Sequence, residues 1–373
     1  MKKKNLIIFG TRPEAIKMAP LVKAFLKNET FETKVCVTAQ HREMLDQVLD
    51  FFEISPDYDL NLMKPGQNLY GLTAAIITGL QPVLEEFKPD YVYVHGDTTT
   101  TMGSSIAGFY SGAKICHVEA GLRTFNKLAP FPEEINRTIT GHIADYHFAP
   151  TQTSFDNLRN EGIPKDNILI TGNTVIDALF ESVSRVDTIE DHEITQLKNE
   201  LDFTKRIVLV TGHRRENHGQ GFINICEALK KIGEVVENVQ IVYPVHLNPK
   251  VQKPVYDILG EQKSIKLIAP LAYPAFVWLM NKCELVITDS GGVQEEAPSL
   301  GKPVLVMRDT TERPEAVDAG TVILVGTDKA KIVNETIDLM GNPERYGKMS
   351  KLHNPYGDGK ACQRIVKFIE NLD

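Results

Sequence analysis

The chain has 373 residues, with 41 Lys and Arg against 49 Asp and Glu, so its formal net charge is −8. This length suits two domains, each large enough to bury its own core. The acidic balance and the lack of a Lys/Arg-rich block argue against nucleic acid or an anionic membrane surface as the main partner, because phosphate neutralisation needs clustered cations. Five cysteines without metal-type spacing argue against disulfides and zinc.

The first residues, Met1 to Asn5, are charged like the start of a signal peptide, and a short apolar run follows them. That run ends at Gly10, which is too early for a signal peptide. No apolar stretch approaches the ~20 residues needed to span a bilayer. We therefore expect a cytoplasmic protein without membrane insertion.

Short apolar and β-branched runs alternate with helical patterns along the chain, which is typical of α/β folds with parallel sheets. In the first half, strands are predicted at 5–9, 33–38, 91–95, 114–118, 146–149 and 168–170. In the second half, they are predicted at 206–210, 239–243, 265–268, 284–288, 303–307 and 322–325. Two such sets predict two doubly wound sheets, and the polar stretch 186–205 predicts a solvated helix near the boundary between them.

The two halves begin alike. Leu6–Glu14 and Val208–Glu216 each read as a strand, a Gly turn, a basic residue and the start of a helix. This favours two similar Rossmann-like domains that face each other. In open α/β sheets, ligands bind outside the carboxyl ends of the strands, so the loops after each predicted strand are the places to look for a site.

An anion site is indicated where the strand at 284–288 ends and Ser290-Gly291-Gly292 opens a helix. The backbone N–H groups and the positive end of a helix can hold a diphosphate, and the glycines allow it to approach closely. Glu296, one turn into that helix, is placed to accept hydrogen bonds from a ribose diol. The alternative is an ordinary N-cap serine followed by a solvated pair of glutamates. The position after a late strand favours the functional interpretation.

Three carboxylates are predicted at one edge of the first sheet. Asp97 and Glu119 follow neighbouring strands, and Glu133 follows Pro132 at the start of a helix. Asp97 alone would be a helix cap and Glu133 alone a partner of the helix dipole. Together they are candidates for acid/base catalysis. The His117-x-Glu119 pattern also occurs in zinc deaminases, but their P-C-x-x-C partner is missing here, so we reject that interpretation.

Basic side chains at the strand ends are supplied singly, by Arg12, Lys17, His213 and Arg313, and together they would neutralise one diphosphate. The apolar run Phe276–Met280 holds the only Trp and is more typical of a core helix than of a ligand platform. The sequence has no G-x-G-x-x-G, P-loop or G-x-S-x-G motif, which argues against nicotinamide, P-loop and serine-hydrolase chemistry. We expect neither a cofactor nor a metal ion.

These motifs resemble those of the non-hydrolysing UDP-N-acetylglucosamine 2-epimerases of bacteria. The likeness extends from residue 5 to about 368 and rests on the segments FGTRPEAIKMAPL, TAQHREMLDQV, VHGDTTTT, HVEAGLRT, PEEINR, TGHRREN, PVHLNP, TDSGGVQEEAPSLGKPVLVMRDTTERPEA and HNPYGDG. The resemblance implies a homodimer of chains with two Rossmann-like domains of the glycosyltransferase-B type and an active site in the cleft between them. The first domain would hold 1–170 with a C-terminal helix at about 356–373 that crosses back, and the second 171–355.

The resemblance also implies the activity, interconversion of UDP-GlcNAc and UDP-ManNAc, and the site residues. Asp97, Glu119, Glu133 and His213 would be catalytic. The substrate would be bound by Arg12, Lys17, Asp97, Glu119, His213, Leu271, Phe276, Ser290, Gly291, Gly292, Glu296 and Arg313. Leu271 and Phe276 would flank the uracil, although Leu271 stands where we expect Gln in close relatives. Some relatives are activated by a second UDP-GlcNAc near the segment equivalent to Gln40-His41-Arg42, and Glu43 departs from their pattern.

The chemistry agrees with the absence of a nicotinamide motif. The proton on C2 of UDP-GlcNAc is too weakly acidic for a carboxylate to remove directly. If the anomeric C–O bond breaks first, positive charge at C1 acidifies that proton and 2-acetamidoglucal forms. Returning a proton to the other face requires at least two acid/base groups, which is a use for the three carboxylates. A glycosyltransferase or hydrolysing epimerase of the same fold, and a non-catalytic UDP-sugar sensor, remain the alternatives.

Overall fold

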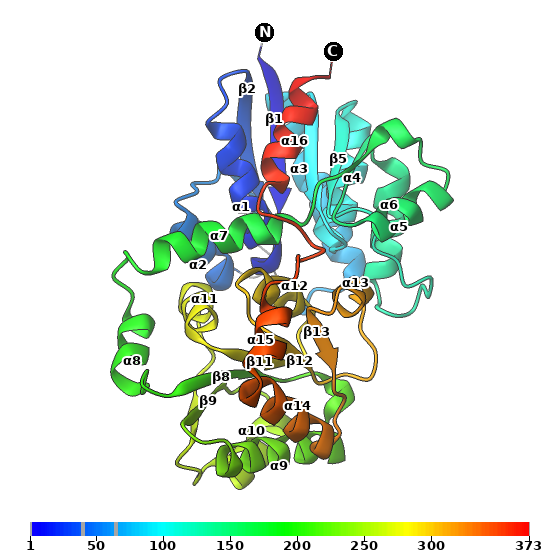
Figure 1. The fold of residues 1–373 in the computed structure, drawn as a ribbon. Coiled ribbons are helices and arrows are strands. Elements are labelled where there is room, and N and C mark those ends of the chain that lie inside the picture. The colour runs from blue at the N-terminus through cyan, green and yellow to red at the C-terminus, as the bar shows by residue number, and fades with distance from the viewer. Residues whose placement is uncertain (1, 39–41, 63–65, 373) are drawn as a thin grey trace. The chain divides into compact units, whose positions relative to one another are not determined.

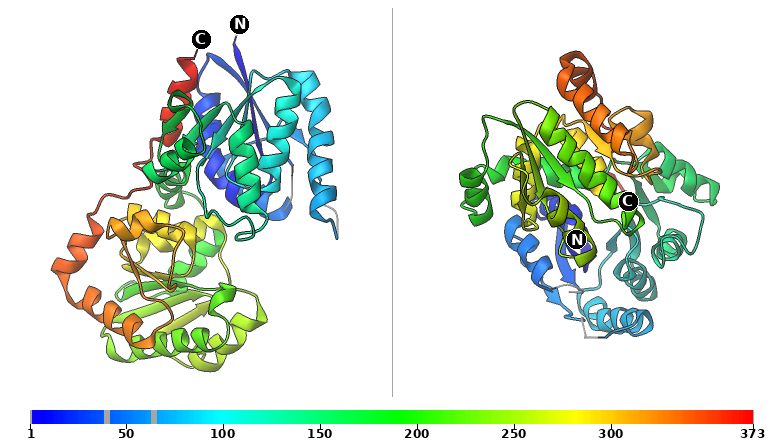
Figure 2. Two further views of the ribbon diagram at one scale, coloured as in Figure 1. Left: turned by 90° about the vertical axis from the view of Figure 1, so that its right-hand side faces the viewer. Right: turned by 90° about the horizontal axis from the view of Figure 1, so that it is seen from below.

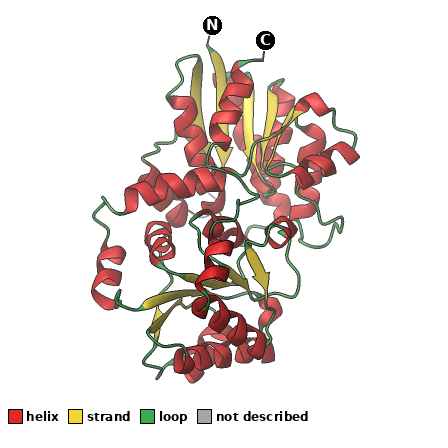
Figure 3. Ribbon diagram, viewed as in Figure 1, coloured by secondary structure: helices red, strands yellow, loops and turns green. Residues whose placement is uncertain are grey.

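The computed structural model describes residues 2–38, 42–62 and 66–372 and divides into two compact units. Unit 1 holds the chain up to Phe180 together with the segment from Tyr356 onward, and unit 2 holds Glu181–Pro355. In each unit a parallel sheet lies between layers of helices (Figure 3). The predicted class, two doubly wound α/β sheets, is therefore confirmed.

In the described part of the chain, the sheet of unit 1 has seven strands in the order β3-β2-β1-β4-β5-β6-β7. The strands are β1 (Lys3–Phe9), β2 (Phe31–Val37), β3 (Tyr58–Asp59), β4 (Tyr91–His95), β5 (Lys114–Val118), β6 (Tyr146–Ala149) and β7 (Ile168–Ile170). The helices are α1 (Arg12–Leu26), α2 (Arg42–Phe52), α3 (Leu69–Phe87), α4 (Thr99–Ser111), α5 (Glu133–Ile143), α6 (Gln152–Asn160), η1 (Lys165–Asn167), α7 (Thr174–Val186) and α16 (Ala361–Glu370).

Every strand predicted for this half is present, apart from small differences at the ends, but the expected number of six was wrong. The missed strand, β3, is only two residues long and pairs with the end of β2 through Cys36↔Tyr58 and Val37↔Asp59. A strand this short has no alternation of apolar and polar residues that a sequence pattern could reveal.

Alternate side chains of β4 pack against opposite helical layers. Val92 and Val94 belong to the core cluster that contains α3, whereas Tyr93 lies against Phe25 of α1, with ring centroids 4.9 Å apart. A strand covered on both faces reads as a continuous apolar run, which is why β4 was predicted without error at either end.

Helix α16 lies beside α1 and β1 (Figures 1 and 2), where the Lys3 ammonium donates to the Ile369 carbonyl at 3.2 Å.

The C-terminal segment is bonded to the first half of α7. The backbone N–H groups of Ala361 and Cys362, at the start of α16, donate to the Asp177 carboxylate at 3.1 and 2.9 Å. The Asn173 N–H donates to the Tyr356 carbonyl at 2.7 Å. These bonds explain why unit 1 extends to Phe180, within α7, whereas the sequence led us to expect a boundary after residue 170.

In the described part of the chain, unit 2 has a six-stranded sheet in the order β10-β9-β8-β11-β12-β13. Its strands are β8 (Arg206–Thr211), β9 (Val239–Pro244), β10 (Ile265–Ile268), β11 (Leu285–Thr288), β12 (Val304–Val306) and β13 (Val322–Leu324). Its helices are α8 (His192–Glu200), η2 (Arg215–Asn217), α9 (Gln220–Val235), α10 (Pro249–Leu259), α11 (Tyr273–Lys282), α12 (Gly291–Ser299), α13 (Pro314–Asp318), α14 (Lys329–Gly341) and α15 (Pro343–Ser350).

The solvated helix expected within 186–205 is confirmed as α8. It begins at His192 because the Asp191 side chain caps it, accepting the Ile194 N–H at 2.9 Å. Among the described residues, no helix is both long and apolar enough to cross a membrane.

Candidate active site

The loop between β1 and α1 is held by a buried carboxylate. Thr11 and Glu14 form a capping box, in which Glu14 Oε2 accepts the N–H groups of Gly10 at 3.1 Å and Thr11 at 2.8 Å. Glu14 Oε1 accepts the Thr98 hydroxyl at 2.7 Å, which joins this loop to the one before α4. A side chain at position 10 would collide with Thr38, so the turn requires glycine. Arg12, the first residue of α1, is thereby fixed at the end of the sheet.

Glu119 comes directly after β5 and has a positive φ of 59°, a conformation that non-glycine residues adopt at a cost and often at functional sites. Its Oε2 forms an ion pair and hydrogen bond with Lys17 of α1. The same oxygen accepts the Asn173 side-chain amide at 2.8 Å and lies 3.6 Å from His95 Nε2. Burial lowers the pKa of His95 to about 4, so that imidazole is neutral. The Lys17 charge therefore balances Glu119.

Asp97 follows β4 and is held from α5. Arg137 Nη2 lies 2.9 Å from Asp97 Oδ2, and the Asn136 side chain donates to the Asp97 carbonyl at 2.9 Å. Burial raises the pKa of Asp97, Arg137 opposes this, and the charges of Glu119 and Glu133 raise it further. The Asp97 side chain still keeps 30% of its surface exposed, so a small molecule can reach it.

The predicted carboxylates Glu119 and Glu133 thus both lie near enough to Asp97 for their charges to raise its pKa. Glu133 opens α5, and its buried Oε2 has no hydrogen-bond partner among the described residues. Its neighbour Glu134 points elsewhere and accepts the Phe125 N–H at 2.8 Å, which holds the preceding loop. Of these two neighbouring acids, Glu134 is therefore the one that supports the loop before α5.

In unit 2, the N-cap residue of α12 does not cap the helix with its side chain. Ser290 occupies the N-cap position, but its side chain makes no capping hydrogen bond. The ordinary N-cap expected as the alternative is therefore not formed. A Cβ atom added to Gly291 would lie 3.9 Å from the Arg214 guanidinium, and one added to Gly292 would lie 3.8 Å from Glu296 Oε2. The open helix end thus lies between a cation and a carboxylate.

The sequence placed Glu296 one turn into α12, and in the structure it is the sixth residue of that helix. Helical side chains slant toward the N-terminus, so its carboxylate still reaches the first turn, next to Gly292. Arg313 forms an ion pair with Glu295, a side chain only 2% exposed. In the alternative interpretation of the sequence, Glu295 and Glu296 were a solvated pair. In the structure both are buried, and Glu295 orients the predicted diphosphate ligand Arg313.

Asp289, also buried, holds the loop after β8. Its Oδ2 accepts the N–H groups of His213 and Arg214, both at 2.8 Å, and its Oδ1 lies 3.9 Å from His213 Nδ1. The His213 ring stacks on His246 with centroids 5.0 Å apart. Burial lowers the pKa of His213, while Asp289 opposes this shift. His213 is thus a neutral imidazole near pH 7 rather than the cation that the sequence suggested.

The predicted uracil contacts lie at the start of α11. Leu271 and Phe276 are half-buried, as a ligand contact requires, whereas Trp278 is only 2% exposed. Trp278 donates to Asp187 Oδ1 at 3.1 Å, and the core interpretation of this helix is confirmed. The backbone N–H of Ala272 already donates to Glu193 at 2.8 Å, so it is occupied.

Residues 39–41, which include Gln40 and His41 of the segment that the resemblance links to regulation, lie outside the described part of the chain.

Sequence reasoning missed four residues of this site: Glu14, Asn173, Arg214 and Asp289. The Thr11-x-x-Glu14 pattern is a capping-box signature and could have identified the first. Asp289 directly follows β11, as Asp97 follows β4 after one glycine, so its place after a strand could have identified it. Nothing local could have linked Asn173 to Glu119, because the contact joins distant parts of the sequence. In the described part of the chain, no group of His, Cys, Asp and Glu is arranged to hold a metal ion.

Comparison with known proteins agrees with these features. The family model described as UDP-N-acetylglucosamine 2-epimerase matches residues 23–370. The UDP-N-acetylglucosamine 2-epimerase of Escherichia coli O157:H7 is 60% identical over 99% of this chain and 98% of its own length. The crystal structure of the Neisseria meningitidis UDP-GlcNAc 2-epimerase, bound to UDP-GlcNAc, has a TM-score of 0.88 at 50% identity and covers 99% of this chain and 100% of that one.

A structure described as a possible UDP-N-acetylglucosamine 2-epimerase, from Listeria monocytogenes, matches with a TM-score of 0.92 at 48% identity, covering 100% of this chain and 98% of that one. The two parallel α/β units and the match to a solved UDP-GlcNAc 2-epimerase define a nucleotide-sugar enzyme of the glycosyltransferase-B type. Within that class, the chain belongs to the UDP-N-acetylglucosamine 2-epimerase family.

Proposed function

We propose that the protein interconverts UDP-GlcNAc and UDP-ManNAc by eliminating UDP and adding it back after the configuration at C2 has been inverted. The observation that carries this proposal is the group of interacting carboxylates, Asp97, Glu119 and Glu133, at one edge of the unit 1 sheet. Epimerisation through a planar intermediate requires a base on one face and an acid on the other, and a single carboxylate supplies only one of them.

The environments of Asp97 and Glu119 suit two different proton-transfer roles. Glu119 is paired with Lys17, which favours its charged form and makes it a proton acceptor. Asp97 has a raised pKa, mainly because of burial, and so holds a proton more readily than an exposed aspartate. Pairs of acids whose environments differ in this way are typical of acid/base catalysis.

We assign the UDP moiety to unit 2. The uncapped start of α12, at Ser290, Gly291 and Gly292, would accept a phosphate group, with Arg313 beside it. Glu296 would accept hydrogen bonds from the ribose hydroxyls, and Leu271 with Phe276 would flank the uracil. His213, being neutral, would stabilise the departing diphosphate by donating a hydrogen bond rather than by its charge. Arg12 would supply a positive charge from unit 1.

The first experiment is to incubate the purified protein with UDP-GlcNAc alone and follow the products by NMR in D₂O. We expect UDP-ManNAc that carries deuterium at C2, with no net release of UDP. Free ManNAc and UDP would identify a hydrolysing epimerase, and a requirement for a sugar acceptor would identify a glycosyltransferase. Binding without turnover would identify a sensor.

The elimination step has its own test. With ¹⁸O in the bridge between C1 and the β-phosphate, cleavage of the C1–O bond frees UDP and lets the label enter non-bridging positions. Deuterium uptake at C2 without this scrambling would contradict elimination.

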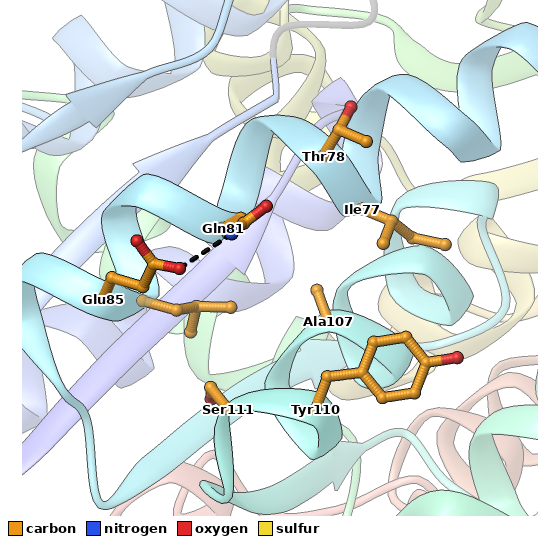
Figure 4. Close-up of a pocket in the computed structure, with 8 residues that line it drawn as sticks. Ile77, Thr78, Gln81, Glu85, Ala107, Tyr110 and Ser111 are labelled. Carbon is orange, nitrogen blue, oxygen red and sulfur yellow. Dashed lines mark hydrogen bonds between the residues drawn. The ribbon is translucent and has the colours of Figure 1, made fainter.

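We further propose a homodimer, supported by the exposed face of α3, α4 and α5. These helices pack side by side and carry exposed apolar residues, including Tyr70, Phe109, Tyr110 and Ile135. A cavity of about 360 Å³ lies between α3 and α4, lined by Ile77, Ala107 and Tyr110 among others (Figure 4). Light scattering should report a dimer, and Phe109→Asp combined with Tyr110→Lys should give a monomer. A monomeric wild-type protein would contradict the proposal.

We also propose that the protein works in the cytoplasm. The five cysteines are buried free thiols, which suits a reducing compartment.

A further inference from the structure

His117 on β5 is not used by the proposed chemistry, but it contacts the residue that precedes Asp97. His117 is only 1% exposed, and its Nε2 lies 2.7 Å from the Gly96 carbonyl oxygen. Burial lowers the pKa of His117 to about 3, so the ring is neutral and carries one N–H. Because a carbonyl only accepts, that hydrogen is on Nε2, and His117 is the donor.

The turn that His117 holds is the one that carries Asp97. Gly96 has a φ of 66°, a conformation that favours glycine, and its N–H donates to the Val118 carbonyl at 2.9 Å. Consecutive residues of β5 therefore bind both polar groups of Gly96. The Gly96 carbonyl belongs to the peptide plane that enters Asp97, so its orientation decides where the Asp97 side chain begins.

The same turn lies against the second acid. A Cβ atom added to Gly96 would be 3.6 Å from Glu119 Oε1. Glu119 directly follows Val118, the last residue of β5, so this strand leads into one acid and orients the turn that carries the other. A rotation of the Gly96–Asp97 peptide would change the separation of the two carboxylates, and catalytic rates are sensitive to displacements of about 1 Å.

We propose that His117 is a positioning residue for epimerisation, which fixes the Gly96–Asp97 peptide and with it the geometry of the Asp97 and Glu119 pair. The inference rests on the proposed function, because it concerns the acids assigned there. His117 does not touch the substrate. Its role differs from that of an ordinary core histidine in that loss of its N–H should change the rate of the chemical step and not only stability.

Two substitutions separate these roles. His117→Gln keeps an N–H donor that reaches about as far as Nε2, whereas His117→Met has a similar size and no donor. Neighbouring His147 on β6 provides the matched control: it is equally buried, its ring packs edge-on against that of His117, and its nitrogens make no hydrogen bond to the Asp97 turn in the described part of the chain. His147→Met should therefore affect stability without affecting the turn.

We expect His117→Met to lower kcat by ~10- to 100-fold with KM and UDP affinity unchanged, since a misplaced acid slows the chemical step and leaves nucleotide binding intact. His117→Gln should stay within about threefold of the wild-type kcat, and so should His147→Met, each corrected for its folded fraction. If His117→Met and His147→Met have the same kcat, or if His117→Gln is as slow as His117→Met, the proposal is overturned.

Hydrogen exchange provides a measurement that does not depend on turnover. The amides of residues 96–98 should exchange faster in His117→Met than in His117→Gln or the wild type, because the peptide loses one of its anchors. Equal exchange in all three would overturn the proposal even in an active enzyme. If instead the wild type fails to epimerise UDP-GlcNAc while exchange changes as expected, the assigned reaction is wrong and the positioning of Asp97 by His117 stands.

Discussion

The loops after the first strand of each unit have the same sequence pattern but are held in different ways. In unit 1, Glu14 comes from the helix that the loop itself opens, and it binds two consecutive backbone N–H groups of that loop. In unit 2, the equivalent Glu216 is half exposed and pairs with Arg308 at 2.7 Å. The loop's N–H groups are bound instead by Asp289, at the end of the neighbouring strand.

The consequence is a difference in where the first helix begins. Helix α1 starts at Arg12, immediately after its cap, whereas the short η2 intervenes in unit 2 and α9 starts only at Gln220. Unit 1 therefore holds its basic residue, Arg12, at the first position of a helix. Unit 2 leaves His213 and Arg214 on a loop beside α12. One sequence pattern thus gives two differently held loops, in the unit to which we assign proton transfer and in the unit to which we assign the diphosphate.

The largest expected effect tests whether proton transfer belongs to unit 1. Asp97→Asn, Glu119→Gln and Glu133→Gln should each lower kcat by ~10² or more, the usual scale for a general acid or base, while UDP affinity stays unchanged. Steady-state kinetics and calorimetry measure the two quantities. Glu29→Gln, an exposed acid outside the site, is the matched control and should have no effect. Wild-type rates in all three site variants would exclude the proposed mechanism.

The complementary test concerns the nucleotide and unit 2. Glu296→Ala should weaken UDP binding by roughly 1 to 3 kcal/mol, because charge-assisted hydrogen bonds to the ribose would be lost. Glu227→Ala removes an exposed glutamate of α9, paired with Lys329 at 2.8 Å, and should leave UDP binding unchanged. Calorimetry that gives both variants the wild-type affinity would move the ribose away from Glu296.

Replacing Glu14 and Asp289, the carboxylates that hold the two loops, by amides tests the comparison between the loops directly. Glu14→Gln should destabilise the protein by roughly 1 to 3 kcal/mol, because an amide cannot accept the Thr98 hydroxyl while its single oxygen accepts the two backbone N–H groups. Asp289→Asn should have an effect of similar size, because the bonds from the His213 and Arg214 N–H groups would lose their charged acceptor. Only Asp289→Asn should also weaken UDP binding, since Asp289 alone holds His213 and Arg214. Denaturant unfolding and UDP titration check these two effects. Equal UDP affinities in the two variants would mean that the loops are not specialised.

The smallest effect is a pH dependence of stability. Burial raises the pKa of Glu14 above its ordinary value of 4.5, and the hydrogen bonds that it accepts only partly oppose this. The folded state therefore binds this proton more tightly than the unfolded state, so Glu14 adds stability below pH 4.5 that is lost as pH rises through its folded pKa. Glu14→Gln should flatten the stability curve in that window. An unchanged slope between the variant and the wild type would show that Glu14 is not perturbed.

The sequence was sufficient for the parts of the fold that depend on local apolar patterns. The strands β4 and β5 of unit 1 and β11 of unit 2 are buried runs followed by polar turns, and each was predicted together with the candidate residue in the loop that follows. Support contacts were not predictable in this way. Asn173 reaches Glu119 only because α7 begins beside β5, and the pairing of Arg313 with Glu295 depends on how α13 returns to α12. Such contacts depend on tertiary structure and leave no local pattern.

The bond between Asn173 and Tyr356 has a consequence for how the protein is made. Asn173 supports the Glu119 carboxylate with its side chain and donates its backbone N–H to the Tyr356 carbonyl. During translation, residues up to Phe180 leave the ribosome long before Tyr356 and α16, because all of unit 2 is synthesised between them. A nascent chain therefore carries its acids in an unfinished unit, which becomes complete only after the last helix has been released.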